Sequence, residues 1–138
     1  MWKYYALLSA FFAALTAILS KVGVKGINGN VATAIRTFVV LLLAWGIVLL
    51  SGQLKEIKEI SKSNLLFLIL SGVATGLSWI FYFKALETGD VSKVAPIDKL
   101  SVAFTMGLAF FVLRETLNLQ TIVGGVLIVI GTLVIIWQ

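Results

Sequence analysis

The stretch LLFLILSGVATGLSWIFYFKAL, residues 65–86, decides the fold class of this chain. It is apolar except for scattered hydroxyl groups and one lysine, Lys84, close to its end. A helix rises ~1.5 Å per residue, so about 20 mainly apolar residues are needed to cross the hydrocarbon core of a bilayer. The stretch meets this requirement and predicts a transmembrane helix.

Four further segments of the same kind surround it. The chain has 138 residues, of which 60% are hydrophobic and only 12% are charged, and a water-soluble domain could not bury that much apolar surface. We therefore expect an all-α integral membrane protein that crosses the plasma or inner membrane several times. It would form a single domain over residues 1–138, with five helices at about residues 2–20, 31–50, 65–86, 94–113 and 119–137.

The Lys and Arg residues near the ends of these spans are shared almost equally between the two sides of the membrane. An odd number of spans places the termini on opposite sides, and a charge bias near zero permits insertion in either orientation. Two copies in opposite orientations would form an inverted repeat, which many secondary transporters build within one longer chain. One side would hold Lys3, Lys55, Lys58, Lys62 and Arg114, and the other Lys21, Lys25, Arg36, Lys84, Lys93 and Lys99.

The composition also excludes several kinds of chemistry. The sequence has no cysteine and no histidine, so it lacks the thiolate and imidazole groups that most often bind metals or act as bases at neutral pH. No phosphate-binding loop is present. We expect no enzymatic activity, no metal and no bound cofactor, and the net charge of +5 follows the ends of the spans rather than indicating nucleic acid.

Polar residues within the spans follow helical spacing and predict a common interior cavity. Hydroxyl groups recur on one face of three spans, while glycines at positions 72 and 76 form a GxxxG contact face beside the stripe of the third span. The alternative is that each hydroxyl bonds a carbonyl of its own helix. The stripes contain Ser9, Thr16 and Ser20 in the first span, Ser71, Thr75, Ser78 and Tyr82 in the third, and Asp98, Ser101 and Thr105 in the fourth.

After Gln120, the last span is apolar except for two threonines and a seam of small residues. Glycines let two helix backbones approach closely, which is how helices associate in lipid. The seam predicts a dimer interface, with packing inside the subunit as the alternative. It consists of Gly124, Gly125 and Gly131.

Ionisable residues within spans are costly in lipid and often mark a functional site. Asp98 and Lys99 lie inside the fourth span after Pro96, which either occupies the first turn or kinks the helix. Lys84 and Glu87 have the spacing of an ion pair on one helix face.

Between the second and third spans, residues 53–62 predict either a short helix at the membrane interface or a solvated turn.

Residues 76–135 closely resemble the second part of an EamA-type domain of the drug/metabolite transporter superfamily. The Y-x-x-A-L pattern at Tyr82 to Leu86, an acidic residue at Asp98 and a turn glutamate at Glu115 match the family, as do Gly125 and Gly131. Lys21 and Arg36 lie where the family commonly has basic residues. The chain departs from the family pattern at Lys99, where the family commonly has proline, and at Arg114, where it usually has glycine.

Larger members of the superfamily resemble two fused units of opposite orientation, so the resemblance implies that this chain is half of an inverted-repeat transporter, an antiparallel homodimer with dual topology. Its function would be the secondary active export of small metabolites or amphipathic compounds by alternating access, with proton coupling. Trp79 and Tyr82 would offer aromatic faces to an amphipathic or cationic substrate. The alternative is a membrane partner without transport of its own, or one subunit of a heterodimer. The residues expected to bind substrate or couple protons are Asp98, Lys99, Trp79, Tyr82, Ser78, Thr75, Thr16, Ser9 and Arg36.

Overall fold

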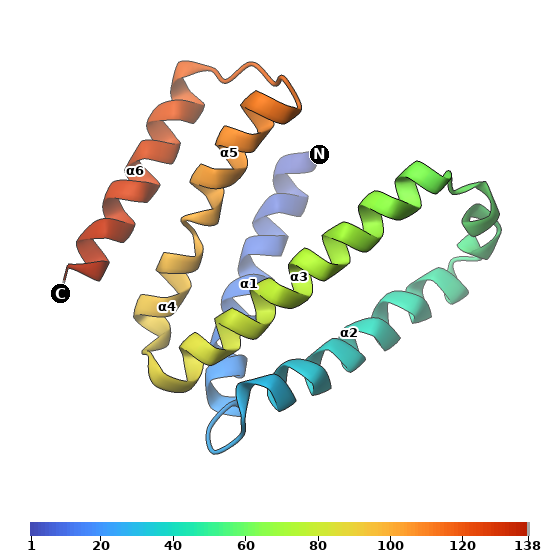
Figure 1. The fold of residues 1–138 in the computed structure, drawn as a ribbon, viewed down its shortest axis with the longest axis horizontal. Helices are drawn as coiled ribbons and strands as arrows, with labels where there is room; N and C mark the ends of the chain where they lie inside the picture. Colours follow the sequence, from blue (N-terminus) through green and yellow to red (C-terminus); the bar gives the residue numbers. More distant parts are fainter. Residues whose placement is uncertain (138) are drawn as a thin grey trace. The chain divides into compact units, whose positions relative to one another are not determined.

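A computed structural model describes residues 1–137, and Gln138, the last residue of the predicted domain, lies outside the described part. All elements in this part are helical, which confirms the all-α prediction. Five segments are long and apolar enough to cross a membrane when Val91–Val112 is counted as one. In chain order the elements are α1 (Trp2–Gly23), α2 (Gly29–Leu50), the 3₁₀ helix η1 (Gln53–Glu59), α3 (Lys62–Thr88), α4 (Val91–Asp98), α5 (Ser101–Val112) and α6 (Leu119–Ile136) (Figure 1).

Asparagines start two of these helices. The Asn28 side chain accepts a hydrogen bond from the Asn30 backbone amide at 2.9 Å and caps α2. Asn118 Oδ1 accepts from both the backbone amide and the hydroxyl of Thr121, at 2.8 and 2.7 Å, and caps α6. These bonds satisfy amides that have no partner inside the helix, which explains why the spans begin at these residues.

Most helices begin or end a few residues outside the spans predicted from hydropathy. α1 continues to Gly23 and α3 begins at Lys62, because polar residues extend a helix beyond the hydrocarbon core without adding to its apolar length. Residues 53–59 form a short helix, as one of the two predictions had it, but of the 3₁₀ type. Three residues make one 3₁₀ turn, so Leu54, Ile57 and Ile60 recur on one side.

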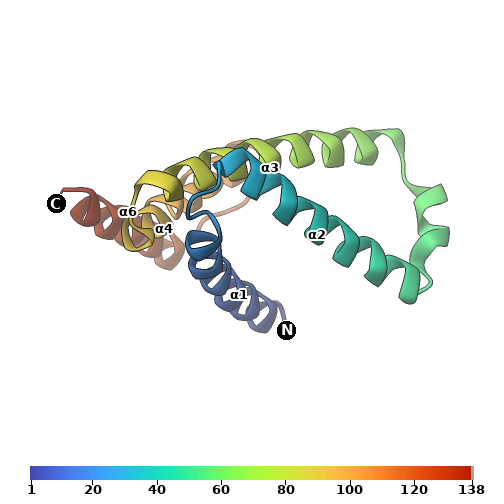
Figure 2. The ribbon, with the colours of Figure 1, turned by 90° about the horizontal axis from the view of Figure 1, so that it is seen from below.

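The chain forms two compact units, residues 1–88 and residues 89–137. In the first unit, α2 and α3 are antiparallel and connected by η1 (Figure 1). Figure 2 shows that they approach each other where α2 begins and separate toward η1. A Cβ atom added to Gly29 would lie 3.2 Å from the Phe83 carbonyl carbon. The absence of a side chain at Gly29 therefore lets the start of α2 lie close to the end of α3.

In the second unit, α6 packs against both α4 and α5. Gly125 is buried, and a Cβ atom at this position would lie 2.6 Å from the sulfur of Met106 on α5. The Thr132 hydroxyl donates to the Ile128 carbonyl at 2.8 Å and lies 3.3 Å from the Pro96 carbonyl of α4. One small residue and one hydroxyl thus hold α6 to its two neighbours.

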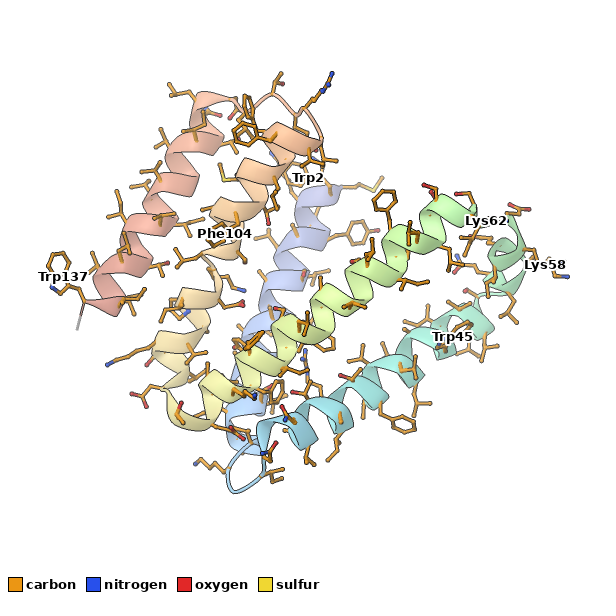
Figure 3. All side chains as sticks on the ribbon, viewed as in Figure 1. Trp2, Trp45, Lys58, Lys62, Phe104 and Trp137 are labelled. Atoms are coloured by element: carbon orange, nitrogen blue, oxygen red, sulfur yellow. The ribbon has the colours of Figure 1, made fainter. Side chains whose placement is uncertain are left out.

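Most apolar side chains of both units project outward from the helices (Figure 3). Trp2 begins α1 and is 73% exposed, and Trp137 follows α6 and is 92% exposed. Tryptophan at the end of a span favours the boundary between headgroups and acyl chains. Surfaces of this kind require lipid or other transmembrane helices around them.

Candidate functional site

Arg36 is a partly buried charged residue of the first unit, on α2. It is seven residues after Gly29, about 10 Å along α2 from its start. The guanidinium carbon lies 4.1 Å from the centroid of the Trp79 ring and 5.7 Å from that of Phe83. Within residues 1–88, no carboxylate forms an ion pair with Arg36. Aromatic faces of α3 therefore hold a cation of α2 in place.

A pocket of about 410 Å³ lies beside this stack, between α1, α2 and α3. Arg36 provides its charge, Thr16 and the buried Ser20 provide hydroxyl groups, and the remaining lining is apolar. The structure thus places two residues predicted to bind substrate, Arg36 and Thr16, in one pocket lining. A third, Trp79, contacts Arg36 through its ring. The lining consists of Thr16, Leu19, Ser20, Gly23, Ile27, Ala32, Ile35, Arg36 and Phe83.

The other predicted residues of the first unit do not line this pocket. Ser9 and Ser78 are exposed on α1 and α3. Thr75 donates its hydroxyl to the Ser71 carbonyl at 2.9 Å, which is the alternative considered for hydroxyls in spans. Tyr82 packs edge to face against Phe83, with the ring centroids 6.4 Å apart.

Two polar contacts join the end of α1 and the start of α2 to the end of α3. Lys21 Nζ donates to the Leu86 carbonyl at 2.6 Å, and the Glu87 carboxylate accepts the backbone N–H of Gly29. A carboxylate is favourable there, because the first amides of a helix carry partial positive charge. The predicted ion pair between Lys84 and Glu87 is wrong for this reason: Glu87 turns to the start of α2.

The fourth span is interrupted near its middle. α4 ends at Asp98, α5 begins at Ser101, and Pro96 lies inside α4 rather than in its first turn. The amides of Lys99 and Leu100 donate to carbonyls three residues earlier, both at 3.0 Å, as in a 3₁₀ turn. The break lies about 11 Å along the helix from Val91.

An ion pair occupies this break. Lys99 Nζ lies 3.1 Å from Asp98 Oδ2, and the side chains remain 54% and 37% exposed, respectively. Adjacent residues do not usually face each other on a regular helix, and this pair lies where α4 ends and the backbone forms a 3₁₀-type turn. The arrangement holds one proton-accepting and one proton-donating group together inside a span.

The glycines of α6 fall into two groups. Gly125 packs against Met106 inside the second unit, as described above. A Cβ atom at Gly124 or Gly131 would meet no other described atom within 4 Å, apart from its own helix and neighbours. These two positions leave room for a further helix, and the dimer interface remains a prediction.

Comparison with known proteins gives the family. Residues 1–137 match the EamA-like transporter family. The chain belongs to this family. As an EamA protein with five apolar helices it is a multi-pass membrane protein of the transporter type, which confirms the resemblance seen in residues 76–135 and in the first half of the chain.

Two relatives of this EamA protein are informative. An uncharacterized transporter in the cobO 3′ region of a Sinorhizobium species is 48% identical over 134 residues, which cover 97% of this chain and 95% of the relative. An uncharacterized protein of Methanocaldococcus jannaschii is 32% identical over 93 residues, 65% of this chain and 68% of the relative. No solved structure matches the chain.

Of the pocket residues that were not among the predicted substrate contacts, Phe83 and Ser20 are the two that spacing along a helix could have indicated. Phe83 lies four residues after Trp79, so the helical period already places both rings on the face that receives Arg36. Ser20 belongs to the hydroxyl stripe of the first span but was not chosen as a contact. Spacing along a helix predicts which residues share a face of that helix. It does not predict that α2 packs against α3.

Proposed function

We propose that this protein is a secondary active transporter that exports small metabolites by alternating access, and that two copies in opposite orientations form the transport unit. The observation that carries the proposal is that a single family unit of five spans accounts for residues 1–137. Two such units of opposite orientation would produce an inverted repeat with a pathway at the repeat interface. The nearly even distribution of Lys and Arg permits both orientations.

The interrupted fourth span supports the transport step. Transporters commonly use discontinuous helices where substrate or coupling ions bind, since the break supplies backbone groups and a point of movement. Here the break carries Asp98 and Lys99, whose ion pair would open when either side chain changes its protonation. Proton binding would thereby bias one conformation of the span over the other.

The open glycines support the assembly. Gly72 and Gly76 on α3, like Gly124 and Gly131 on α6, have room for a neighbouring helix among the described residues. Small residues of this kind permit close helix contact in lipid. A second copy would supply such helices.

Reconstitution of the purified chain in proteoliposomes tests the proposal. A screen of metabolite pools, with a pH gradient across the liposome membrane, should show accumulation of at least one compound that protein-free liposomes do not accumulate. The same liposomes without the gradient should exchange that compound without concentrating it. If the chain alone moves no compound in the full screen, it lacks transport of its own and the homodimeric transporter is overturned.

A further inference from the structure

We propose that the pocket beside Arg36 binds the anionic group, a carboxylate or a phosphate, of the transported substrate. The inference deepens the proposed function, on which it rests, by naming the substrate class as small organic anions or zwitterions. Three observations support it: Arg36 is the ionisable residue of the pocket lining, its N–H groups make no hydrogen bond within residues 1–88, and its guanidinium lies over the Trp79 ring.

The charge of the pocket favours an anion. Among the residues that line it, Arg36 is the ionisable one, and the other polar groups are the hydroxyls of Thr16 and Ser20. The remaining lining is apolar, so the electrostatic interaction with a ligand is screened less than in water. A cationic ligand would be repelled by Arg36 and would find no carboxylate in the lining.

The ring stack leaves the guanidinium able to bind. Contact with Trp79 and Phe83 uses the faces of the aromatic rings. No hydrogen bond within residues 1–88 uses an Arg36 N–H as donor. A guanidinium presents its N–H groups as a planar fork that matches the two oxygens of a carboxylate or phosphate. Arg36 is therefore fixed in position while its donors remain unsatisfied in the first unit.

The occupied ring argues against the expected cationic substrate. The Arg36 guanidinium already lies over one face of the Trp79 ring, 4.1 Å from the centroid, and its charge would repel a second cation bound at that ring. The volume of about 410 Å³ is within the range of pockets that hold small ligands. The apolar lining would contact the hydrocarbon part of the substrate while Arg36 binds its charge.

Binding of matched probes to the detergent-solubilised, full-length protein tests the inference. Four probes separate charge from shape: 3-phenylpropionate, phenyl phosphate, the neutral 3-phenylpropanamide and the cationic 3-phenylpropylamine. Calorimetric titration should show that at least one of the two anions binds about tenfold or more tightly than the amide, with the amine weakest. The better anion would identify carboxylate or phosphate as the preferred group.

Two substitutions assign the preference to Arg36. Arg36→Gln should remove the difference between anion and amide, and Arg36→Lys should retain part of it, because lysine keeps the charge but not the planar fork. Lys55→Gln, which removes a positive charge from η1 outside the pocket, should leave the preference unchanged. Thermal unfolding of each variant checks its folding, and the comparison of the four probes on the unmodified protein needs no variant.

The inference is overturned if the four probes bind equally, if the amine binds best, or if neither anion binds. The proposed function fails separately. Selective anion binding without transport in proteoliposomes would retain the pocket and contradict the transporter, whereas transport of amines with no anion binding would retain the transporter and contradict the pocket.

Discussion

The two units of this protein hold their charged residues in different ways. In the first unit, Arg36 is stacked on aromatic rings and Glu87 binds the start of a neighbouring helix, so each charged group connects two helices. In the second unit, Asp98 and Lys99 pair only with each other, at a break within one span, and both remain partly exposed.

We propose that this difference reflects a division of roles. Contacts between helices have to break before the helices can separate, so the first unit is suited to a preformed binding site. An ion pair within one span changes without disturbing a neighbour, so the fourth span is suited to a protonation-dependent movement. The predictions below test this division, beginning with the largest expected effect.

Loss of the ion pair should abolish coupling. Asp98→Asn and Lys99→Gln each remove one of the two groups proposed to couple protons, so accumulation driven by a pH gradient should fall by at least about tenfold in proteoliposomes. Exchange without a gradient should persist, because the pocket in the first unit is unchanged. Lys93→Gln, on the exposed first turn of α4, is the matched control. Unchanged coupling in both variants would remove the pair from the mechanism.

A larger side chain at Gly29 should disrupt the first unit. Gly29→Leu would force the start of α2 away from Phe83 and Glu87, and should lower the free energy of unfolding by about 1–3 kcal/mol. Titration with a denaturing detergent in mixed micelles measures this change. Gly46→Leu, at a position of α2 with room for a side chain, should have little effect. Equal losses in the two variants would show that the contact with α3 is not what requires glycine.

Substitutions at two glycines of α6 should have different effects, one on the free energy of unfolding and the other on dimer formation. Gly125→Val would collide with Met106, whose flexible side chain can move partly aside, and should lower the free energy of unfolding by about 1–2 kcal/mol. Gly131→Val should leave that quantity nearly unchanged and reduce the dimer fraction seen by crosslinking in membranes. If Gly131→Val leaves the dimer fraction intact, α6 does not form the interface through this residue.

The smallest expected effect is at Arg114. Its φ angle of 55° lies in the left-handed region that favours glycine, and the family usually has glycine there, so Arg114→Gly should raise the free energy of unfolding by about 1 kcal/mol. Arg114→Ala removes the same charge without relieving the backbone and serves as the control. If the two variants are equally stable, the backbone at this position costs nothing measurable.

Hydropathy predicted the five spans because each contains enough apolar residues to cross the membrane. It did not predict the break after Asp98, since the span remains apolar beyond that residue; the signal in the sequence was Pro96, which left open either a kink or a place in the first turn. Polar and ionisable residues within the spans predicted Thr16 and Arg36 as site residues, and the family resemblance added Trp79. Neither predicted the stack, because Arg36 and Trp79 belong to different helices and no local period encodes how those helices cross. The contact of Glu87 with Gly29 was missed for the same reason.

The central claim is that two oppositely oriented copies form one transporter, and the orientation of the chain in its native membrane tests it most directly. The sequence has no cysteine, so Ser63→Cys, at an exposed position in the first turn of α3, introduces a single reactive thiol. A membrane-impermeant maleimide added to intact cells should label about half of the molecules, and the rest only after permeabilisation. Labelling of nearly all or nearly none before permeabilisation would show one orientation and contradict the antiparallel homodimer.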